Sequence, residues 1–514
     1  MRQTHNSLHE LVHRMGKSEK RYFRLFTQQQ GGGGQNYLHL FDELLKMECY
    51  DEDELRTRMA KLGLYKNLKA TKKYLYDNIL KCLKLYFVDY CISVKLPDAL
   101  QNMRVLLNKG MFEDAARAYR KIEDVYTTNE QFGGLFDVLT FGERLWRTIL
   151  PGSEAAPKLR GIYQQKQLCL QYLNNLNEFV FLKNEIELVF QDAFNGREPE
   201  RTDRLIAFAG HHLLTHPGLA MSIRARMEHF ECLCLIHYGS SDWEALADAS
   251  HEALSMIEGQ SLDQYFVLNW RTTMHRFACL AALRRDDEAR FEQCAEAMER
   301  YLAEWSPRVN LLDSMAGRFR FLLVRLNRHF QNLDYAKFIG LFLENEEFVL
   351  ENWKYFDNTL RGELALLLAQ VYAYRQDYRA ALDWTHRITR HERDYALTAQ
   401  IGWARMLEVW LHLRDDNYAL AVSLVRSTQR FLQKSGDLLP TERLLLRYLN
   451  KIAKDQGVDQ EKYWNELRAR LDPLAEMDSH LLYRDGLRVD RLLRTVGKTR
   501  CRRAEQERKV VRGN

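Results

Sequence analysis

The segment Asp377-Tyr378-Arg379-Ala380-Ala381-Leu382 decides the fold class of this 514-residue chain. An apolar helical stretch ends just before it, and an alanine-rich helical stretch follows. Asp377 can cap the second helix by accepting hydrogen bonds from its first free amides. Tyr378 can pack over the turn, and the small alanines let the two helices approach closely. The segment therefore predicts a tight turn between two packed helices.

The same pattern recurs along the chain. The copies are Asp242-Trp243-Glu244-Ala245-Leu246, Asp334-Tyr335-Ala336 and Asn417-Tyr418-Ala419-Leu420-Ala421, with the variants Gly110-Met111-Phe112-Glu113-Asp114-Ala115-Ala116 and Asp286-Asp287-Glu288-Ala289. The markers Trp243, Glu288, Tyr335, Tyr378 and Tyr418 lie 45, 47, 43 and 40 residues apart. One helix pair cannot bury its apolar face alone, so such pairs must stack. The pattern predicts an all-α helical-repeat array over residues 96–483, with two degenerate repeats in residues 160–230.

Two copies carry a family resemblance. The segments Gly110 to Tyr119 and Asp377 to Leu382 resemble the turn and second helix of tetratricopeptide repeats. The resemblance covers residues 100–470 in separate pieces. It implies a right-handed solenoid of stacked antiparallel helix pairs, a concave face that binds peptides or proteins, and no active site. The 40–47-residue period departs from the usual period of about 34 residues, so armadillo- or HEAT-like geometry stays an alternative.

Residues 1–95 lack the turn pattern and predict a separate module of four or five helices, among them Tyr37 to Met47, Glu52 to Leu62 and Asn67 to Val88. Three of its segments resemble the N-terminal region of a group of uncharacterised bacterial helical-repeat proteins. They are Lys17 to Phe23, Tyr37 to Asp42 and Tyr74 to Leu80. The resemblance implies that the module is a unit, and it carries no known activity.

The composition favours helices in a reduced, aqueous environment. The chain has only 8 prolines, expected at helix boundaries: Pro97, Pro151, Pro157, Pro199, Pro217, Pro307, Pro440 and Pro473. No apolar run approaches the ~18 residues of a membrane span, and no secretory signal is seen. The 9 cysteines are odd in number and scattered, which predicts reduced core thiols. These features together predict a cytoplasmic protein.

The two ends of the chain are basic and the middle is acidic. Residues 1–95 hold 17 Lys and Arg against 11 Asp and Glu, and residues 484–514 hold 11 against 4. Candidate contacts to an anionic partner are Lys69, Lys72 and Lys73 in the module and Arg500, Arg502 and Arg503 in the tail. The tail follows an amphipathic stretch that can cap the array. Solvated helix faces explain the same charges without any ligand.

Three groups of residues match metal-binding patterns only in part. His9-Glu10-Leu11-Val12-His13 has the H-E-x-x-H spacing of zinc proteases, but no third ligand stands out downstream. His212 and His216 are four residues apart beside Pro217, which indicates a helix end. Cys232, Cys234 and His237 share one apolar segment without a second ligand pair, which indicates core packing. The sequence therefore predicts no catalytic residue, no metal and no cofactor.

The function predicted from these observations is a non-enzymatic scaffold or adaptor that binds peptide or protein partners on a helical-repeat surface. The alternative is a nucleic-acid-associated regulator that uses the basic module and the basic tail. No membrane partner is expected.

Overall fold

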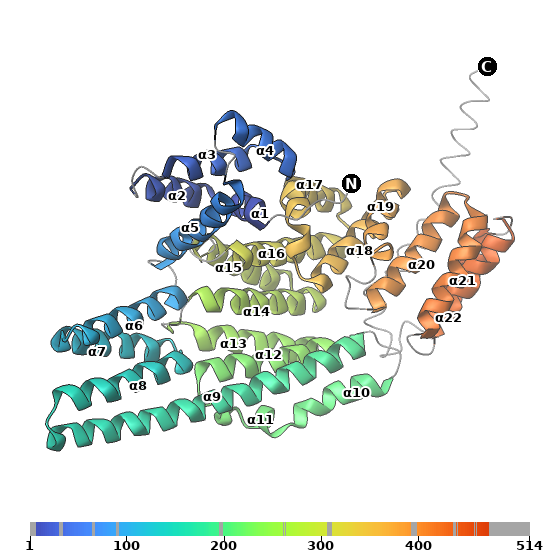
Figure 1. The fold of residues 1–514 in the computed structure, drawn as a ribbon. Coiled ribbons are helices and arrows are strands. Elements are labelled where there is room, and N and C mark those ends of the chain that lie inside the picture. The colour runs from blue at the N-terminus through green and yellow to red at the C-terminus, as the bar shows by residue number, and fades with distance from the viewer. Residues whose placement is uncertain are drawn as a thin grey trace. The chain divides into compact units, whose positions relative to one another are not determined.

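The computed structural model describes residues 7–29, 34–63, 67–88, 92–194, 199–260, 262, 264–305, 311–391, 398–434, 438, 440–456, 458 and 460–471. Every regular element among them is helical, which confirms the all-α prediction. The chain forms two compact units, Met1–Lys166 and Gln167–Asn514, and their division falls within helix α9 (Gly152–Phe194). Figure 1 shows the order of the helices along the chain.

Five helices open the first unit and share a core of their own, as the sequence predicts for this region. They are α1 (Ser7–Arg14), α2 (Lys17–Gln29), α3 (Gly34–Leu45), α4 (Glu52–Lys61) and α5 (Leu68–Val88). Phe23, Phe41 and Leu75 are among the fully buried residues of this core. The predicted boundary between residues 95 and 96 lies inside the first unit, because α6 packs on α5.

The rest of the first unit continues as packed helices. These are α6 (Ile92–Asn108), α7 (Phe112–Thr128) and α8 (Phe132–Ile149), followed by the start of α9. Helix α7 begins at Phe112, as the turn pattern predicts, after Gly110 in the left-handed region at φ 73°. The Tyr119 ring packs so closely on α8 that a Cβ at Gly142 would lie 2.5 Å from it. Gly142 therefore permits the close approach of α7 and α8.

Residues 160–230 correct one prediction. Instead of two degenerate helix pairs, α9 alone runs for 43 residues, a length of about 64 Å at 1.5 Å per residue. It is followed by α10 (Pro199–Ala207) and the one-turn helix α11 (His212–Thr215). The expectation that prolines mark helix boundaries is wrong at two positions. Pro97 lies inside α6 and Pro157 inside α9, each within the first two turns.

The described residues of the second unit include six helix pairs in sequence. The first helices of the pairs are α12 (Ile223–Gly239), α14 (Gln264–Arg284), α16 (Leu311–Gln331), α18 (Asn358–Tyr374), α20 (Thr398–Arg414) and α22 (Pro440–Lys454). The second helices are α13 (Trp243–Ile257), α15 (Glu288–Trp305), α17 (Tyr335–Asn352), α19 (Tyr378–Thr389), α21 (Tyr418–Lys434) and α23 (Gln460–Leu471). The five predicted markers are thus the first residues of α13, α15, α17, α19 and α21. The turn prediction is confirmed at each of them.

Each of these five turns has the same backbone geometry. The residue two positions before the marker is left-handed: Ser241, Asp286, Leu333, Gln376 and Asp416 have φ between 55° and 67°. The next amide then bonds to the carbonyl five residues earlier, as in Asp377 N–H to Tyr372 O at 3.0 Å. The Asp242, Asp334 and Asp377 carboxylates accept hydrogen bonds from the second-helix amides. Local hydrogen bonding therefore explains why these short segments end one helix and begin the next.

The first helices form a continuous layer. Each one from α12 to α20 contacts the first helix of the next pair, and contacts of comparable extent between second helices are absent from the described part of the array. In a curved two-layer stack, the helices of the inner layer lie closer to one another than those of the outer layer. The contacts between successive first helices therefore place these helices on the inner side of the array. The largest core of the unit lies between these layers in α16–α23, with Leu364, Leu368 and Trp410 deeply buried.

Candidate functional site

Five consecutive first helices meet at one cavity of about 180 Å³ in the second unit. We call it the inner cavity. It is partly open to solvent. The first helices line it with Leu235 and Tyr238 from α12, Arg276, Phe277 and Arg284 from α14, Asn327 from α16, Thr359, Leu360, Glu363, Leu366, Leu367 and Gln370 from α18, and Gln400 and Trp403 from α20. Phe190 from α9 and Trp243 from α13 complete the lining. The lining residues are spread along the chain from Phe190 to Trp403, so only tertiary packing brings them together.

An ion pair crosses the inner cavity. The Arg276 guanidinium lies 2.7 Å from the Glu363 carboxylate, and the Asn327 amide donates a 2.8 Å hydrogen bond to the other oxygen of Glu363. Burial by itself lowers the pKa of Arg276, but the Glu363 carboxylate more than offsets this and raises it. Both side chains line the cavity, Arg276 from α14 and Glu363 from α18.

Gln400 is a buried amide with spare hydrogen-bonding capacity. Its side chain is 3% exposed, and its Nε2 donates to the Thr359 carbonyl at 2.9 Å. Its Oε1 is buried and accepts no hydrogen bond from any described residue. That oxygen packs against Gly362, where a Cβ would lie 2.0 Å away. A glycine at this position therefore lets α18 and α20 approach around an amide group.

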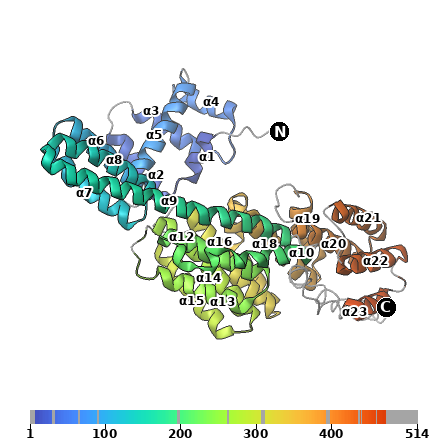
Figure 2. The ribbon, with the colours of Figure 1, turned by 90° about the horizontal axis from the view of Figure 1, so that it is seen from below.

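Aromatic rings form one wall of the inner cavity. The Tyr238 ring lies 5.9 Å from those of Phe190 and Trp243 and 5.8 Å from that of Phe277. Phe190 comes from α9, whose second half packs on α12 through Phe179, Leu182 and Ile186. Figures 1 and 2 both show this part of α9 beside α12. The cavity thus offers rings on one side and charged or amide groups on the other.

The structure separates the basic residues predicted to contact an anionic partner. Lys72 is tied inside the first unit, with its Nζ 2.5 Å from Glu52 Oε2 and 2.7 Å from the Tyr50 hydroxyl. Lys69 and Lys73 are exposed and, four residues apart on α5, share one helix face. Arg500, Arg502 and Arg503 lie outside the described residues, as does the whole tail 484–514.

The two histidine rings of the H-E-x-x-H motif contact backbone carbonyls at and just after the C-terminal end of α3. His9 Nε2 lies 2.7 Å from the Met47 carbonyl, and His13 Nε2 lies 2.9 Å from the Leu44 carbonyl. The Leu44 carbonyl belongs to the last turn of α3, and Met47 lies two residues beyond the end of that helix. Glu10 pairs with Arg14 on the outer side. The motif thus connects α1 to α3 through the ring nitrogens that a metal would need.

The other two candidate groups also have local roles. His211 Nδ1 accepts a hydrogen bond from the Leu213 amide at the start of α11, and His216 follows its end, as predicted. Cys232 and Cys234 are fully buried in different core clusters, which confirms the core-packing prediction for the two thiols. Burial raises the pKa of both thiols far above the usual range, so neither is a thiolate at neutral pH.

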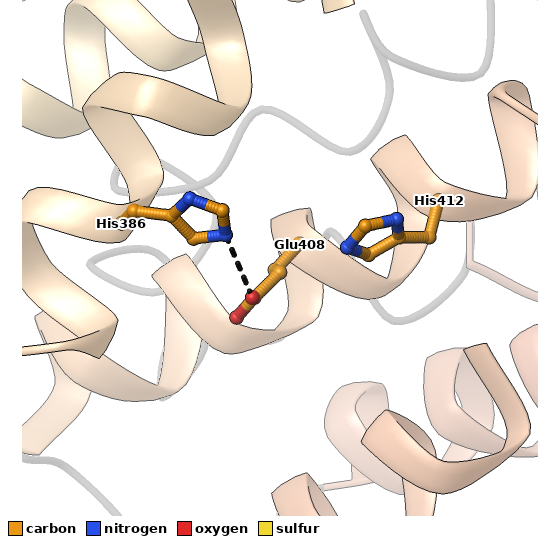
Figure 3. Close-up of side chains that lie close together, drawn as sticks. All are labelled: His386, Glu408 and His412. Carbon is orange, nitrogen blue, oxygen red and sulfur yellow. Dashed lines mark hydrogen bonds and ion pairs between the residues drawn. The ribbon is translucent and has the colours of Figure 1, made fainter. Parts of the chain in front are cut away.

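A cluster that the sequence analysis missed lies between α19 and α20. His386 Nε2 is 3.1 Å from Glu408 Oε1, and one ligand atom from each of His386, Glu408 and His412 lies within 4.8 Å of the others. Figure 3 shows a ring nitrogen of His412 pointing toward Glu408. The Glu-x-x-x-His spacing in α20 was a detectable signal. His386 could not be assigned to this cluster from the sequence, because only tertiary packing places α19 beside α20.

Comparison with known protein families, curated proteins and solved structures found no match for this chain. Among the helices in the described ranges, none combines the length and apolar character that crossing a membrane requires.

Proposed function

We propose that this protein is a non-enzymatic adaptor whose helical array binds a segment of a partner protein, with one side chain of that segment inserted into the inner cavity. In this proposal the array is a right-handed, tetratricopeptide-like solenoid with a 40–47-residue period, and it acts in the cytoplasm. The observation that carries the proposal is the convergence of five first helices on one partly open cavity.

The size of the inner cavity favours a side chain over a cofactor. Its volume of about 180 Å³ is below the ~300–1,000 Å³ of pockets that enclose drug-sized molecules and cofactors. One large side chain fits such a volume. Repeat arrays present extended inner surfaces to peptides, so the rest of the segment would lie along the first helices.

The chemistry of the lining favours an aromatic anchor with a polar end. Tyr238 and Trp403 provide ring contacts, while Gln400 and the Arg276–Glu363 pair provide hydrogen-bonding groups. Tyr and Trp bury a large apolar area and carry one polar group, which is the combination this lining suits. Such anchors in central pockets contribute most of the affinity of typical protein interfaces.

The test is a selection of peptides from a random display library on the immobilised full chain. The selected peptides are expected to share one aromatic residue, and its replacement by Ala should weaken binding at least about tenfold. Leu360→Trp fills the cavity from α18 and should abolish binding. Leu343→Trp, at an exposed position on α17, is the matched control and should bind normally. Equal binding to the Leu360→Trp variant, or no enriched peptide, would contradict the proposal.

The nucleic-acid alternative rests on a smaller observation, the shared exposed face of Lys69 and Lys73 on α5. Phosphate contacts weaken steeply as salt rises. A mobility-shift assay with mixed DNA and RNA should therefore show binding at low salt that Lys69→Gln/Lys73→Gln reduces. No shift at low salt would eliminate this alternative.

A further inference from the structure

We infer that His386, Glu408 and His412 form a binding site for one divalent transition-metal ion of the zinc class. The site joins two neighbouring helix pairs, because His386 lies in the last turn of α19 and the other two residues lie one turn apart on α20. It is separate from the inner cavity, which none of the three residues lines. Neither the turn pattern nor the proposed partner binding accounts for it.

The geometry of the cluster is close to that of a bound site. Zinc with nitrogen and oxygen ligands has metal–ligand distances of about 2.0–2.1 Å, which places tetrahedral ligand atoms about 3.3 Å apart. His386 and Glu408 already meet this spacing at 3.1 Å. The separations reach at most 4.8 Å, so a shift of about 1.5 Å in the side chains closes the site.

The donor set selects the class of ion. Two imidazoles and one carboxylate suit Zn²⁺ and its first-row neighbours, whereas Ca²⁺ and Mg²⁺ require oxygen ligands. The Nδ1 atom of His412 is buried and makes no hydrogen bond to a described residue. The side chains of His386 and Glu408 are 22% and 14% exposed, which leaves an entry path.

Two other turns of the array show what distinguishes this position. His237 and His329 occupy the same position in their turns as His412 does in its own. In each turn the histidine carbonyl accepts a hydrogen bond from the backbone amide of the residue just before the marker. The residues one turn before these two histidines are Leu233 and Arg325, and neither is a metal ligand at neutral pH. Among the described turns, only the one after α20 combines the histidine with a glutamate one turn before it and a second histidine across the helix interface.

Three protein ligands leave a fourth position of a tetrahedral ion open to water. The bound ion would act as a clamp between α19 and α20, because its ligands come from both helices. Because metal binds the folded state, occupancy should raise the melting temperature of the chain. The clamp would add to the contacts that already join α19 and α20, such as the hydrogen bond from Arg414 to the Tyr378 hydroxyl.

The test uses the untagged full-length chain, stripped of metal with a chelator and dialysed against Zn²⁺ or Co²⁺. We expect one ion per chain by elemental analysis and intense visible absorption of the Co²⁺ form, which reports low-symmetry coordination. His412→Asn, His386→Asn and Glu408→Gln should each weaken binding more than the about 10–100-fold that loss of an outer-shell partner costs. Glu408→Gln keeps the shape of the side chain and so separates loss of the ligand from misfolding, which circular dichroism monitors.

Two control variants make the assignment specific. His329→Asn changes the equivalent histidine of another turn and should leave stoichiometry and affinity unchanged. His13→Asn disrupts the H-E-x-x-H motif and should also leave them unchanged. Absence of binding by the wild-type chain, persistence of binding in the three ligand variants, or loss of binding only in His13→Asn would overturn the inference.

Discussion

Arg276 on α14 and Glu363 on α18 form a 2.7 Å ion pair although 87 residues separate them in the chain. Their side chains are 12% and 22% exposed, so most of their surface is withdrawn from water. The pair spans two steps of the array and lies at the inner cavity. It therefore fixes α14 relative to α18 at the proposed binding site.

Breaking this pair should destabilise the second unit strongly. Glu363→Gln or Arg276→Met alone leaves one partner without its counter-charge, which in buried pairs costs about 3–5 kcal/mol. The double variant Arg276→Met/Glu363→Gln should lose clearly less than the sum of the two single variants, because no buried charge remains. Urea unfolding of the four proteins measures this coupling. Additive effects would show that the two side chains do not act as a pair.

Two glutamates one turn apart on α12 should respond oppositely to neutralisation. Burial raises the pKa of Glu231 to about 6, and the Glu228 and Glu187 carboxylates add to the effect while Lys183 opposes it. Glu228 lies 2.6 Å from the Lys183 ammonium and serves as its counter-ion. Glu231→Gln is therefore expected to stabilise the protein at pH 8, and Glu228→Gln to destabilise it.

The sign for Glu231 follows from proton linkage. The folded state keeps its proton to a higher pH than the unfolded state, whose pKa is about 4.3. The stabilisation is thus complete below about pH 4.3 and is lost as pH rises through about 6. At pH 8 Glu231→Gln should gain about 1–2 kcal/mol in unfolding free energy. An equal effect of the substitution at pH 4 and pH 8 would contradict this assignment.

His275 on α14 should make the second unit sensitive to acid. It is 6% exposed, neither ring nitrogen has a hydrogen-bond partner among the described residues, and burial together with nearby Arg271 lowers its pKa to about 4. The unfolded pKa is about 6.5, so stability is complete above that pH and falls as pH drops toward 4. His275→Leu should reduce the acid-induced loss of unfolding free energy by up to about 3 kcal/mol.

Unfolding free energies of wild type and His275→Leu at pH 7 and pH 4.5 measure the effect of this histidine. His251→Leu, at an exposed position on α13, is the control and should keep the wild-type pH dependence. A parallel acid response of His275→Leu and wild type would rule out His275 as the source.

The turn before α17 contains a leucine in a conformation that suits glycine. Leu333 has φ 58°, and its side chain is 52% exposed, so little apolar burial would be lost on truncation. Leu333→Gly should therefore stabilise the protein by about 1 kcal/mol. Gly110 occupies the matching position before α7 at φ 73°, and Gly110→Ala should cost about the same amount. Denaturant midpoints check both, and a destabilised Leu333→Gly variant would refute the argument.

The repeated turns were predictable because their causes are local. An Asp or Asn that caps a helix, a left-handed residue before it and an apolar stripe after it act within a few residues of one another. The predicted starts at Trp243, Tyr335 and Tyr378 are the observed ones for this reason. The prediction of two degenerate repeats in residues 160–230 was wrong because no local signal interrupts α9 before Phe194, and Pro157 near its start does not stop it.

The sequence alone thus determined the helical class of this protein and the positions where its second helices begin, since helix propensity and capping depend on neighbours in the chain. The inner cavity and the cluster of His386, Glu408 and His412 were decided only by tertiary structure. Their members come from helices that are close in space because stacked pairs curve around one another. The angle between successive pairs depends on the sum of many side-chain contacts, and no short segment encodes it.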